Sequence, residues 1–485
     1  MALVRRSTCS ERRAVSGWEL AADDAGGAPD LEALATRRLD WLPARVPGTA
    51  ASSLHAAGRW ALGDRYPFDA KDFWYRASFP SEPRAGERTV LRLGGLATAC
   101  DVWLNGQHVL RSNNMFHRHA LDVTGLVGAE NRLALRFGAL DAALKARRPR
   151  PRWRTRLVAQ QQLRWHRTTL LGRIPAWTPP APPVGPWRGV DLETQRFVAV
   201  EDARVRPSLA GRRGLVDVEL RLRPLGARGP LSVEIAVGPA RAALAVSEGE
   251  GGILAARGQV VVEEAPLWWP HTHGAQPLLE VRAIVTGPGG EAQLDLGRTG
   301  FRILARADEG DGFGLRVNGV VVFCRGASWT PLDVVSLDAD PAATRAALEA
   351  VRRCGMNMVR LSGTMVYEDE TFHDACDELG ILVWQDFMFA NMDYPVAEES
   401  FAASVRREAS QLLDRVDVSP AIAVVCGGSE VEQQAAMMGL PRDQWTSPLF
   451  SELLPQAVAE RRPDLLYVPS TPTGGALPPV GVDGT

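Results

Sequence analysis

The stretch GMNMVRLSGTMVYEDETFHDACDELGILVWQDFMFANMDYP, residues 355–395, contains two apolar runs with an amphipathic segment between them. The runs NMVRLSG (357–363) and ILVWQDF (381–387) have the length and composition of buried strands. The segment DETFHDACDELG (369–380) has helical spacing, and its final glycine is a common stop signal for a helix. The stretch therefore predicts a strand–helix–strand unit.

The same alternation continues on both sides of this unit. Further strand-like and helix-like runs are VVVFCRG (320–326), PAATRAALEAVRRCG (341–355), FAASVRREASQLLDRV (401–416), AIAVVCGG (421–428) and LLYVPS (465–470). Continuous apolar strands between amphipathic helices are typical of a parallel sheet that is covered on both faces. Five such strands fit between residues 306 and 485, whereas a complete (β/α)₈ barrel takes about 250 residues. We therefore expect 306–485 to form the N-terminal part of a TIM barrel that stops some three strands short.

The chain before residue 306 has a different pattern, with short alternating runs separated by turn residues. Runs such as FWYRASF (73–79) and NRLALRF (131–137) predict a jelly-roll β-sandwich over residues 1–197. Residues 198–305 continue the β pattern for about the length of one immunoglobulin-like sandwich. The predicted fold class is therefore multidomain β plus α/β, with a jelly roll, an immunoglobulin-like sandwich and a partial barrel.

Composition excludes several classes of function. The 485 residues carry a net charge of -2, which gives no electrostatic reason to expect a nucleic acid or an anionic membrane as partner. No apolar stretch reaches 18 residues, and no apolar segment follows the N-terminal arginines, so we expect no membrane span, no signal peptide and a cytoplasmic location. The cysteines and histidines lack metal-ligand spacing, and no phosphate-cradling glycine loop is present, so we expect neither a metal nor a cofactor.

Polar and aromatic side chains gather at the predicted carboxyl ends of the strands, where barrels place their active sites. They are Trp329, Arg360, Trp384, Asp386, Ser429 and Glu430. Carboxylates can act as acid, base or nucleophile at a sugar acetal, and indole faces stack on pyranose rings. The inventory therefore favours carbohydrate chemistry. Two structural alternatives remain open, since Glu430 could simply favour the start of the next helix and Arg360 could anchor a structural ion pair.

Several stretches also resemble family 2 glycoside hydrolases, and the β-mannosidase branch most closely. Residues 355–395 resemble that family's barrel, and SPAIAVVCGGSEVEQ (419–433) resembles its acid/base strand. Upstream, GGLATACDVWLNG (94–106) and LWWPHTHGAQPLLEV (267–281) resemble its sugar-binding jelly roll and its immunoglobulin-like domain. The likeness runs in collinear order over nearly the whole chain.

The resemblance implies that Glu430 is the general acid/base, with Ser429 in the position of an asparagine that binds the sugar. It also implies a retaining mechanism, which needs a carboxylate nucleophile about 5–5.5 Å from the acid/base. In the family that residue ends the seventh barrel strand, so we expect no residue of this sequence to be assignable as nucleophile. Asp386, Arg360, Trp329 and Trp384 are the remaining predicted substrate-binding residues.

Two hypotheses about function follow. The first is a retaining exo-β-glycosidase that acts on β-mannosides or related β-glycosides, with a carbohydrate as its partner. The alternative is a carbohydrate-binding relative that is catalytically incomplete because it lacks the nucleophile. The sequence leaves the sugar, the linkage and the oligomeric state open.

Overall fold

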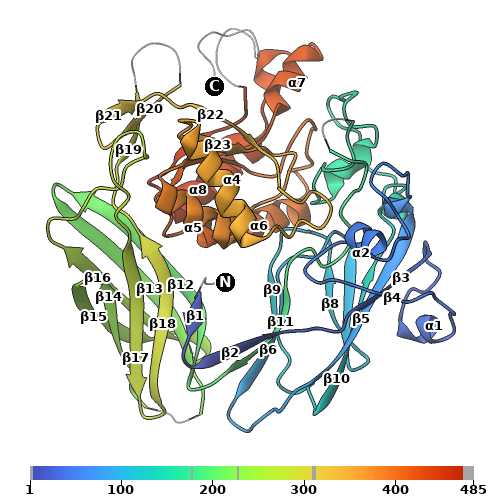
Figure 1. Ribbon diagram of the computed structural model, residues 1–485, viewed down its shortest axis with the longest axis horizontal. Coiled ribbons are helices and arrows are strands. Elements are labelled where there is room, and N and C mark those ends of the chain that lie inside the picture. Colours follow the sequence, from blue (N-terminus) through green and yellow to red (C-terminus); the bar gives the residue numbers. More distant parts are fainter. Residues whose placement is uncertain (1–3, 176–177, 227–228, 308–312, 473–485) are drawn as a thin grey trace.

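Three regions that follow one another in the sequence surround the N-terminal segment in the computed structural model (Figure 1). The structure describes residues 4–175, 178–226, 229–307 and 313–472. Two β regions, drawn in blue to cyan and in green to yellow, lie beneath an α/β region drawn in orange and red. None of the helices in these ranges combines the length and the apolar character that a membrane crossing requires.

The first region contains two antiparallel sheets that share one core. One sheet has the order β2 (Ser10–Ala14), β11 (Val190–Gln195), β6 (Arg88–Leu93) and β9 (His119–Asp122). The other has the order β4 (Leu42–Pro43), β3 (Glu19–Asp24), β5 (Lys71–Pro80), β10 (Glu130–Phe137), β7 (Cys100–Leu104) and β8 (Gln107–Ser112). Alternate residues of β10 are buried, as a sheet with one face on the core requires. Leu133 and Leu135 of β10 and Leu91 of β6 lie in the same apolar cluster, so the two sheets pack face to face.

Short helices decorate this first region. They are α1 (Leu31–Ala35), α2 (Ala50–Ala56), η1 (Phe68–Ala70), α3 (Leu140–Ala143) and η2 (Gln161–Trp165). A capping box fixes the start of α2, where Thr49 accepts a hydrogen bond from the backbone of Ser52 and the Ser52 side chain accepts one in return.

The middle region is a single antiparallel ladder that folds over on itself. Its elements are β12 (Val198–Ala210), β13 (Arg213–Pro224), β14 (Ser232–Val237), β15 (Ala240–Glu248), η3 (Glu250–Gly252), β16 (Leu254–Val262), β17 (Leu279–Gly287) and β18 (Gly290–Thr299). β15 pairs with both β14 and β16, and β1 (Arg6–Ser7) adds to the outer edge of β18. Val218 of β13 and Ala283 of β17 share one apolar cluster, so the two halves enclose a common core.

The third region begins with a small antiparallel sheet and continues as a parallel one. The small sheet consists of β19 (Leu304–Ala307), β20 (Gly314–Val317) and β21 (Val320–Val322). The parallel sheet has its strands in sequence order, β22 (Gly326–Trp329), β23 (Met358–Leu361), β24 (Leu382–Asp386), β25 (Ile422–Cys426) and β26 (Leu466–Val468). The connecting helices are α4 (Pro341–Arg353), α5 (Glu370–Leu379), α6 (Glu399–Arg415), α7 (Val431–Met437), η4 (Arg442–Gln444), η5 (Leu449–Leu453) and α8 (Leu454–Arg461).

Local sequence signals explain these elements. Asp369 caps the first turn of α5, and Gly380 ends the helix in the left-handed conformation with a φ of 69°. Every residue of β24 and β25 is buried, as expected for parallel strands with both faces covered. The predicted strand–helix–strand unit of residues 355–395 is confirmed by β23, α5 and β24.

A segment of the first region docks on the α/β region and fixes their relative position. Arg167 forms a bidentate ion pair with Glu408 of α6, with N–O distances of 2.6 and 2.8 Å. Arg152 makes a similar pair with Asp393, and the Thr155 hydroxyl donates to Gln434 of α7. The middle region also contributes, because Arg302 donates to the carbonyl groups of Pro420 and Ile422 beside β25.

Candidate active site

The carboxyl ends of four neighbouring strands bring together the polar side chains of the α/β region. Arg360 lies on β23, Asp386 ends β24, Ser429 and Glu430 follow β25, and Thr471 follows β26. The strands are parallel and adjacent, so their carboxyl ends meet at one edge of the sheet. This is the edge at which parallel sheets generally bind ligands.

Arg360 is the centre of a hydrogen-bonded cluster. Its Nη2 donates to Asp386 Oδ2 at 2.7 Å, to Ser429 Oγ at 2.9 Å and to the hydroxyl of Thr471. Ser429 in turn donates to Asp386 Oδ2 at 2.7 Å. The guanidinium group of Arg360, which lies on β23, therefore connects this strand to the ends of three others, β24, β25 and β26.

Asp386 serves the cluster as an acceptor. Its side chain is completely buried, and beyond Arg360 and Ser429 it accepts from Trp384 Nε1 at 3.0 Å and from the backbone N–H of Gly363 at 3.2 Å. Four donors around one carboxylate engage both of its oxygens and occupy the positions that a substrate would need. This environment suits a group that holds Arg360 and Ser429 in place.

Glu430 lies beside the cluster but outside its hydrogen bonds. The residue is half-buried, its backbone N–H donates to the carbonyl of Thr471 at 2.6 Å, and its carboxylate makes no hydrogen bond to another described residue. Burial lowers the pKa of Arg360, but attraction to Asp386, with a smaller contribution from Glu430, outweighs it and raises the pKa. Glu430 is therefore a carboxylate near a guanidinium that keeps its oxygens available.

The backbone around Glu430 is strained. Glu430 has a φ of 55°, in the left-handed region that favours glycine, and Asn391 has a φ of 56°. The two residues belong to one local structure, because Asn391 N–H donates to the carbonyl of Ser429 at 3.1 Å. Strained non-glycine residues cluster at functional sites, where the surrounding fold compensates their cost.

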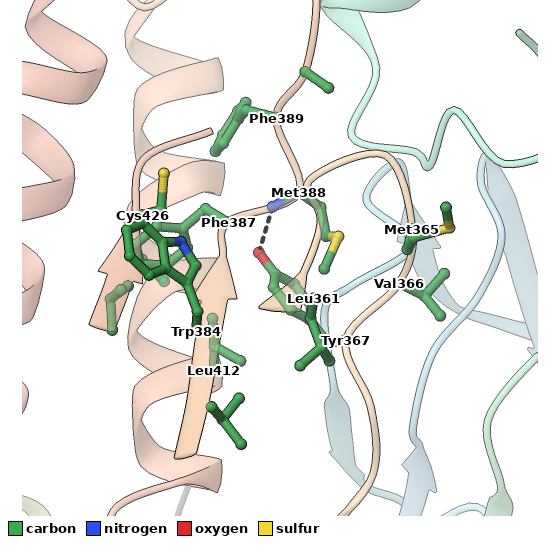
Figure 2. Packing of buried hydrophobic residues seen from close by; sticks show 14 of the residues in the cluster. Leu361, Met365, Val366, Tyr367, Trp384, Phe387, Met388, Phe389, Leu412 and Cys426 are labelled. Carbon is green, nitrogen blue, oxygen red and sulfur yellow. Dashed lines mark hydrogen bonds between the residues drawn. The ribbon is translucent and has the colours of Figure 1, made fainter. Parts of the chain in front are cut away.

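Buried aromatic and sulfur-containing side chains pack around the strand ends (Figure 2). Trp384, Phe387, Phe389 and Cys426 are all at most 8% exposed and belong to the main apolar cluster. The Tyr367 hydroxyl accepts from the backbone N–H of Met388 at 3.1 Å, which fixes the loop after β24. The polar cluster is therefore held by a rigid apolar support.

A pocket of about 380 Å³ borders the polar cluster at Arg360, Trp384 and Thr471. Ser328 also lines it, the other lining residues are small, apolar or sulfur-containing, and Glu430 is not among them. A guanidinium group, hydroxyl groups and an indole suit a ligand rich in hydroxyl groups, such as a sugar. In the described ranges no group of three or more histidine, cysteine and acidic side chains could hold a metal ion.

Comparison with known proteins agrees with this geometry. The family described as glycosyl hydrolase 2 galactose-binding domain-like matches residues 18–188. A β-mannosidase B from Aspergillus terreus is 30% identical over 477 residues, covering 90% of this chain and 55% of the relative. A β-mannosidase B from Aspergillus clavatus is 32% identical over 444 residues, covering 83% of this chain and 50% of the relative.

The chain is similar to glycoside hydrolases of family 2. Solved structures support the same fold. A β-D-mannosidase from Dictyoglomus thermophilum matches 96% of this chain and 58% of its own with a TM-score of 0.83 at 24% identity. An exo-chitosanase from Amycolatopsis orientalis matches 97% of this chain and 54% of its own with a TM-score of 0.67 at 19% identity. The chain spans about half the length of the relatives that it matches.

The structure brings together most of the side chains that the sequence singled out. Arg360, Trp384, Asp386 and Ser429 form one hydrogen-bonded group, and Glu430 lies next to it. Trp329 lies elsewhere. Its Nε1 donates to Glu368 at 2.9 Å and its ring packs on Phe372, so the structure does not place this indole in the cluster.

Three contributors to the cluster, Ser362, Gly363 and Thr471, were not among the predicted site residues. The Ser362 hydroxyl lies 3.0 Å from the Ser429 hydroxyl. Thr471 accepts a hydrogen bond from Arg360, and Gly363 donates its backbone N–H to Asp386 and, at 3.0 Å, to Ser429. The position of Thr471 after the fifth strand is a signal that could have found it. Gly363 acts through its backbone at a point where a Cβ atom would lie 2.2 Å from the carbonyl oxygen of Phe389, and no side-chain pattern reports such an approach.

Proposed function

We propose that this chain carries the acid/base part of a retaining exo-β-glycosidase that acts on β-mannosides or related β-glycosides. The names of the relatives support this assignment and favour a hydrolase over a carbohydrate-binding protein without activity. Since the chain covers about half of each relative, the activity of the whole protein and its substrate are part of the proposal.

The position of Glu430 is the observation that carries the proposal. Its carboxylate lies at the carboxyl end of a parallel strand, beside Arg360 and in a strained backbone conformation. In the proposed reaction Glu430 protonates the glycosidic oxygen as it leaves and then removes a proton from the attacking water. Arg360, Trp384 and Ser429 bind the sugar, and Asp386 positions Arg360 and Ser429.

A retaining reaction also requires a carboxylate nucleophile. Asp386 is poorly suited to this role, because four donors already engage its two oxygens. We assign no nucleophile among the described residues.

The resemblance to family 2 glycoside hydrolases also suggests a domain type for each of the three regions. We propose that residues 1–197 form a jelly-roll sugar-binding domain and that residues 198–305 form an immunoglobulin-like sandwich. Residues 306–485 are proposed to be the N-terminal part of a (β/α)₈ barrel. The order of β22 to β26, parallel and sequential, supports the last assignment.

The test is to replace Glu430 with glutamine in the protein that the whole gene encodes. Assays with aryl β-mannoside, β-glucoside, β-galactoside and β-glucosaminide first identify the sugar. Glu430→Gln should then lower kcat/KM about 10²–10⁴-fold for an alkyl glycoside, whose leaving group needs protonation. A dinitrophenyl glycoside should be affected much less at the step that cleaves the glycosidic bond, because its leaving group departs as an anion.

The control is Glu399→Gln, which changes an exposed glutamate of the same region at the start of α6. It should leave both substrates unaffected. Equal losses on the alkyl and dinitrophenyl glycosides in Glu430→Gln would contradict the acid role of Glu430.

A further inference from the structure

A second pocket, of about 340 Å³, lies where the N-terminal segment, the first β region and the α/β helices meet. Val4 and Arg5, which directly precede β1, belong to the lining of this pocket. None of its lining residues belongs to the Arg360 cluster. Six arginines line it, and they are Arg5, Arg12, Arg92, Arg118, Arg188 and Arg415.

The arginines come from distant parts of the sequence. Arg12 lies on β2 and Arg92 lies on β6, and these two strands flank β11 in the four-stranded sheet. Arg118 precedes β9, Arg188 precedes β11, and Arg415 is the last residue of α6. The pocket is therefore a product of how the regions dock on one another.

Six arginines and three carboxylates, Asp191, Asp369 and Glu370, line this pocket. Carboxylates just outside the lining compensate part of the positive charge. Arg5 is paired with Asp374 at 2.6 Å, and Arg188 lies 3.7 Å from Asp369. Arg12 lies 3.7 Å from Glu193, which also pairs with Arg92.

Arg118 and Arg415 donate hydrogen bonds to backbone carbonyl groups, and the Glu370 carboxylate attracts both of them. Arg118 donates to the carbonyl of Gln411 at 3.0 Å, and Arg415 donates to the carbonyl of Glu368 at 3.1 Å. The Nε atoms of Arg118 and Arg188 are buried without an acceptor among the described residues. Each of these donors is costly to bury unless a ligand or water accepts its hydrogen bond.

The electrostatic environment supports the same interpretation. Burial is the main cause that lowers the pKa of Arg118 and of Arg415, and neighbouring arginines lower both further. Glu370 and a second carboxylate, Asp414 for Arg118 and Asp369 for Arg415, act in the opposite direction without cancelling the effect. A guanidinium group keeps its proton in proteins, so the unfavourable energy remains in the folded state. An anion in the pocket would offset it.

We propose that this pocket binds a phosphate group, either as inorganic phosphate or on a phosphorylated sugar. A phosphate is a compact anion of nearly two charges with several acceptor oxygens, which matches a cluster of guanidinium groups that donate in pairs. The volume is at the small end of ordinary ligand pockets and is sufficient for a sugar phosphate. The inference does not depend on the proposed hydrolase activity.

The experiment titrates the purified chain with inorganic phosphate and with glucose 6-phosphate in a calorimeter. Glucose and sodium chloride at matched ionic strength are the controls for the sugar and for screening. We expect a Kd below about 1 mM for at least one phosphate compound, together with a rise in Tm that the controls do not produce. A tighter Kd for glucose 6-phosphate identifies a sugar phosphate as the ligand, and equal values identify the free anion.

Substitution of single arginines tests whether phosphate binds in this pocket. Arg12→Gln changes a partly exposed side chain, so the protein should fold normally, and it should weaken phosphate binding about tenfold. Arg118→Gln should weaken binding further, with its folding checked by circular dichroism. Arg213→Gln, which removes an exposed arginine paired with Glu263 on the middle region, should leave Kd unchanged. Absence of binding at about 10 mM, or an unchanged Kd in Arg12→Gln, would overturn the proposal.

Discussion

Glu430 combines an available carboxylate with a backbone conformation that a glutamate adopts only at a cost. The left-handed conformation is set by neighbours on both sides, because Glu430 N–H donates to Thr471 and Asn391 N–H donates to Ser429. Helix α7 begins directly after Glu430, and the Glu430 side chain does not cap it. The residue therefore contributes little to local stability, as expected where a conformation is retained for function.

Substitution of Glu430 by glycine and by alanine should separate these effects. Both variants remove the carboxylate, but only glycine adopts a φ of 55° without strain. We expect Glu430→Gly to be about 1 kcal/mol more stable than Glu430→Ala, measured by urea unfolding. At ordinary helical positions alanine is the more stabilising residue, so a more stable Glu430→Ala would contradict the strained conformation.

At the scale of elements, helix α5 is fastened to the start of β25 by one buried carboxylate. Asp377 accepts from the Ser419 hydroxyl at 2.6 Å and from Ala421 N–H at 2.9 Å. Burial raises the pKa of Asp377 from its ordinary 3.8 to about 7, although these hydrogen bonds act in the opposite direction. The attachment of this helix is therefore sensitive to pH.

The direction of the pH dependence follows from the difference between the pKa of Asp377 in the folded chain and in the unfolded chain. Below pH 4 Asp377 is protonated in both the folded and the unfolded chain, and between pH 4 and 7 only the unfolded chain loses the proton. The contribution of Asp377 to stability is therefore complete in acid and is lost as the pH rises to about 7. From the size of the shift the loss is at most on the order of 4 kcal/mol.

Asp377→Asn keeps an acceptor in place and removes the titration. We expect the stability of Asp377→Asn relative to the wild type to rise between pH 4 and 8, measured by urea unfolding at each pH. Glu378→Gln is the matched control, because hydrogen bonds from Arg345 and Arg298 outweigh burial and lower the pKa of Glu378. Its relative stability should change in the opposite direction, and a parallel change in both variants would contradict the assignment.

At the scale of the whole molecule, a buried ion pair connects the first region to the α/β region. Arg167 and Glu408 are almost completely buried, and Glu408 also accepts from Asn114 at 3.0 Å and from the Tyr367 hydroxyl at 2.8 Å. Burial raises the pKa of Glu408, but the attraction of Arg167 outweighs it, so the pKa is lowered. The same tyrosine holds the loop after β24, which links this interface to the candidate site (Figure 2).

Removal of one partner of this ion pair should lower the free energy of unfolding more than removal of both partners. Arg167→Met leaves the Glu408 charge buried and should cost about 3–5 kcal/mol. The double variant Arg167→Met/Glu408→Gln should recover part of this loss, because no uncompensated charge remains. Urea unfolding of the two single variants and the double variant gives the coupling energy. Additive losses would show that the pair does not lock the two regions together.

Local patterns in the sequence were sufficient for β23, α5 and β24. The prediction of residues 320–326 as the first parallel strand was wrong, because Val320–Val322 form β21 of the small antiparallel sheet and the first parallel strand is β22 (Gly326–Trp329). The apolar runs of β23 and β24, the capping residue Asp369 and the stop at Gly380 act over a few residues, so periodicity reports them. The same logic placed Arg360, Asp386, Ser429 and Glu430 at one edge of the sheet, because parallel strands align their carboxyl ends. The similarity to family 2 glycoside hydrolases was also contained in the sequence.

Only the tertiary structure decided how these side chains interact. The bond from Arg360 to Thr471 joins residues 111 positions apart, and the direction of Trp329 toward Glu368 depends on how the neighbouring loop packs. The arginine pocket collects residues from position 5 to position 415, and local propensity contains no information about their proximity. The sequence by itself therefore determined most strands of the parallel sheet, the edge at which the polar residues meet and the similarity to a family. Packing between distant segments decided which charges are compensated and which remain available to a ligand.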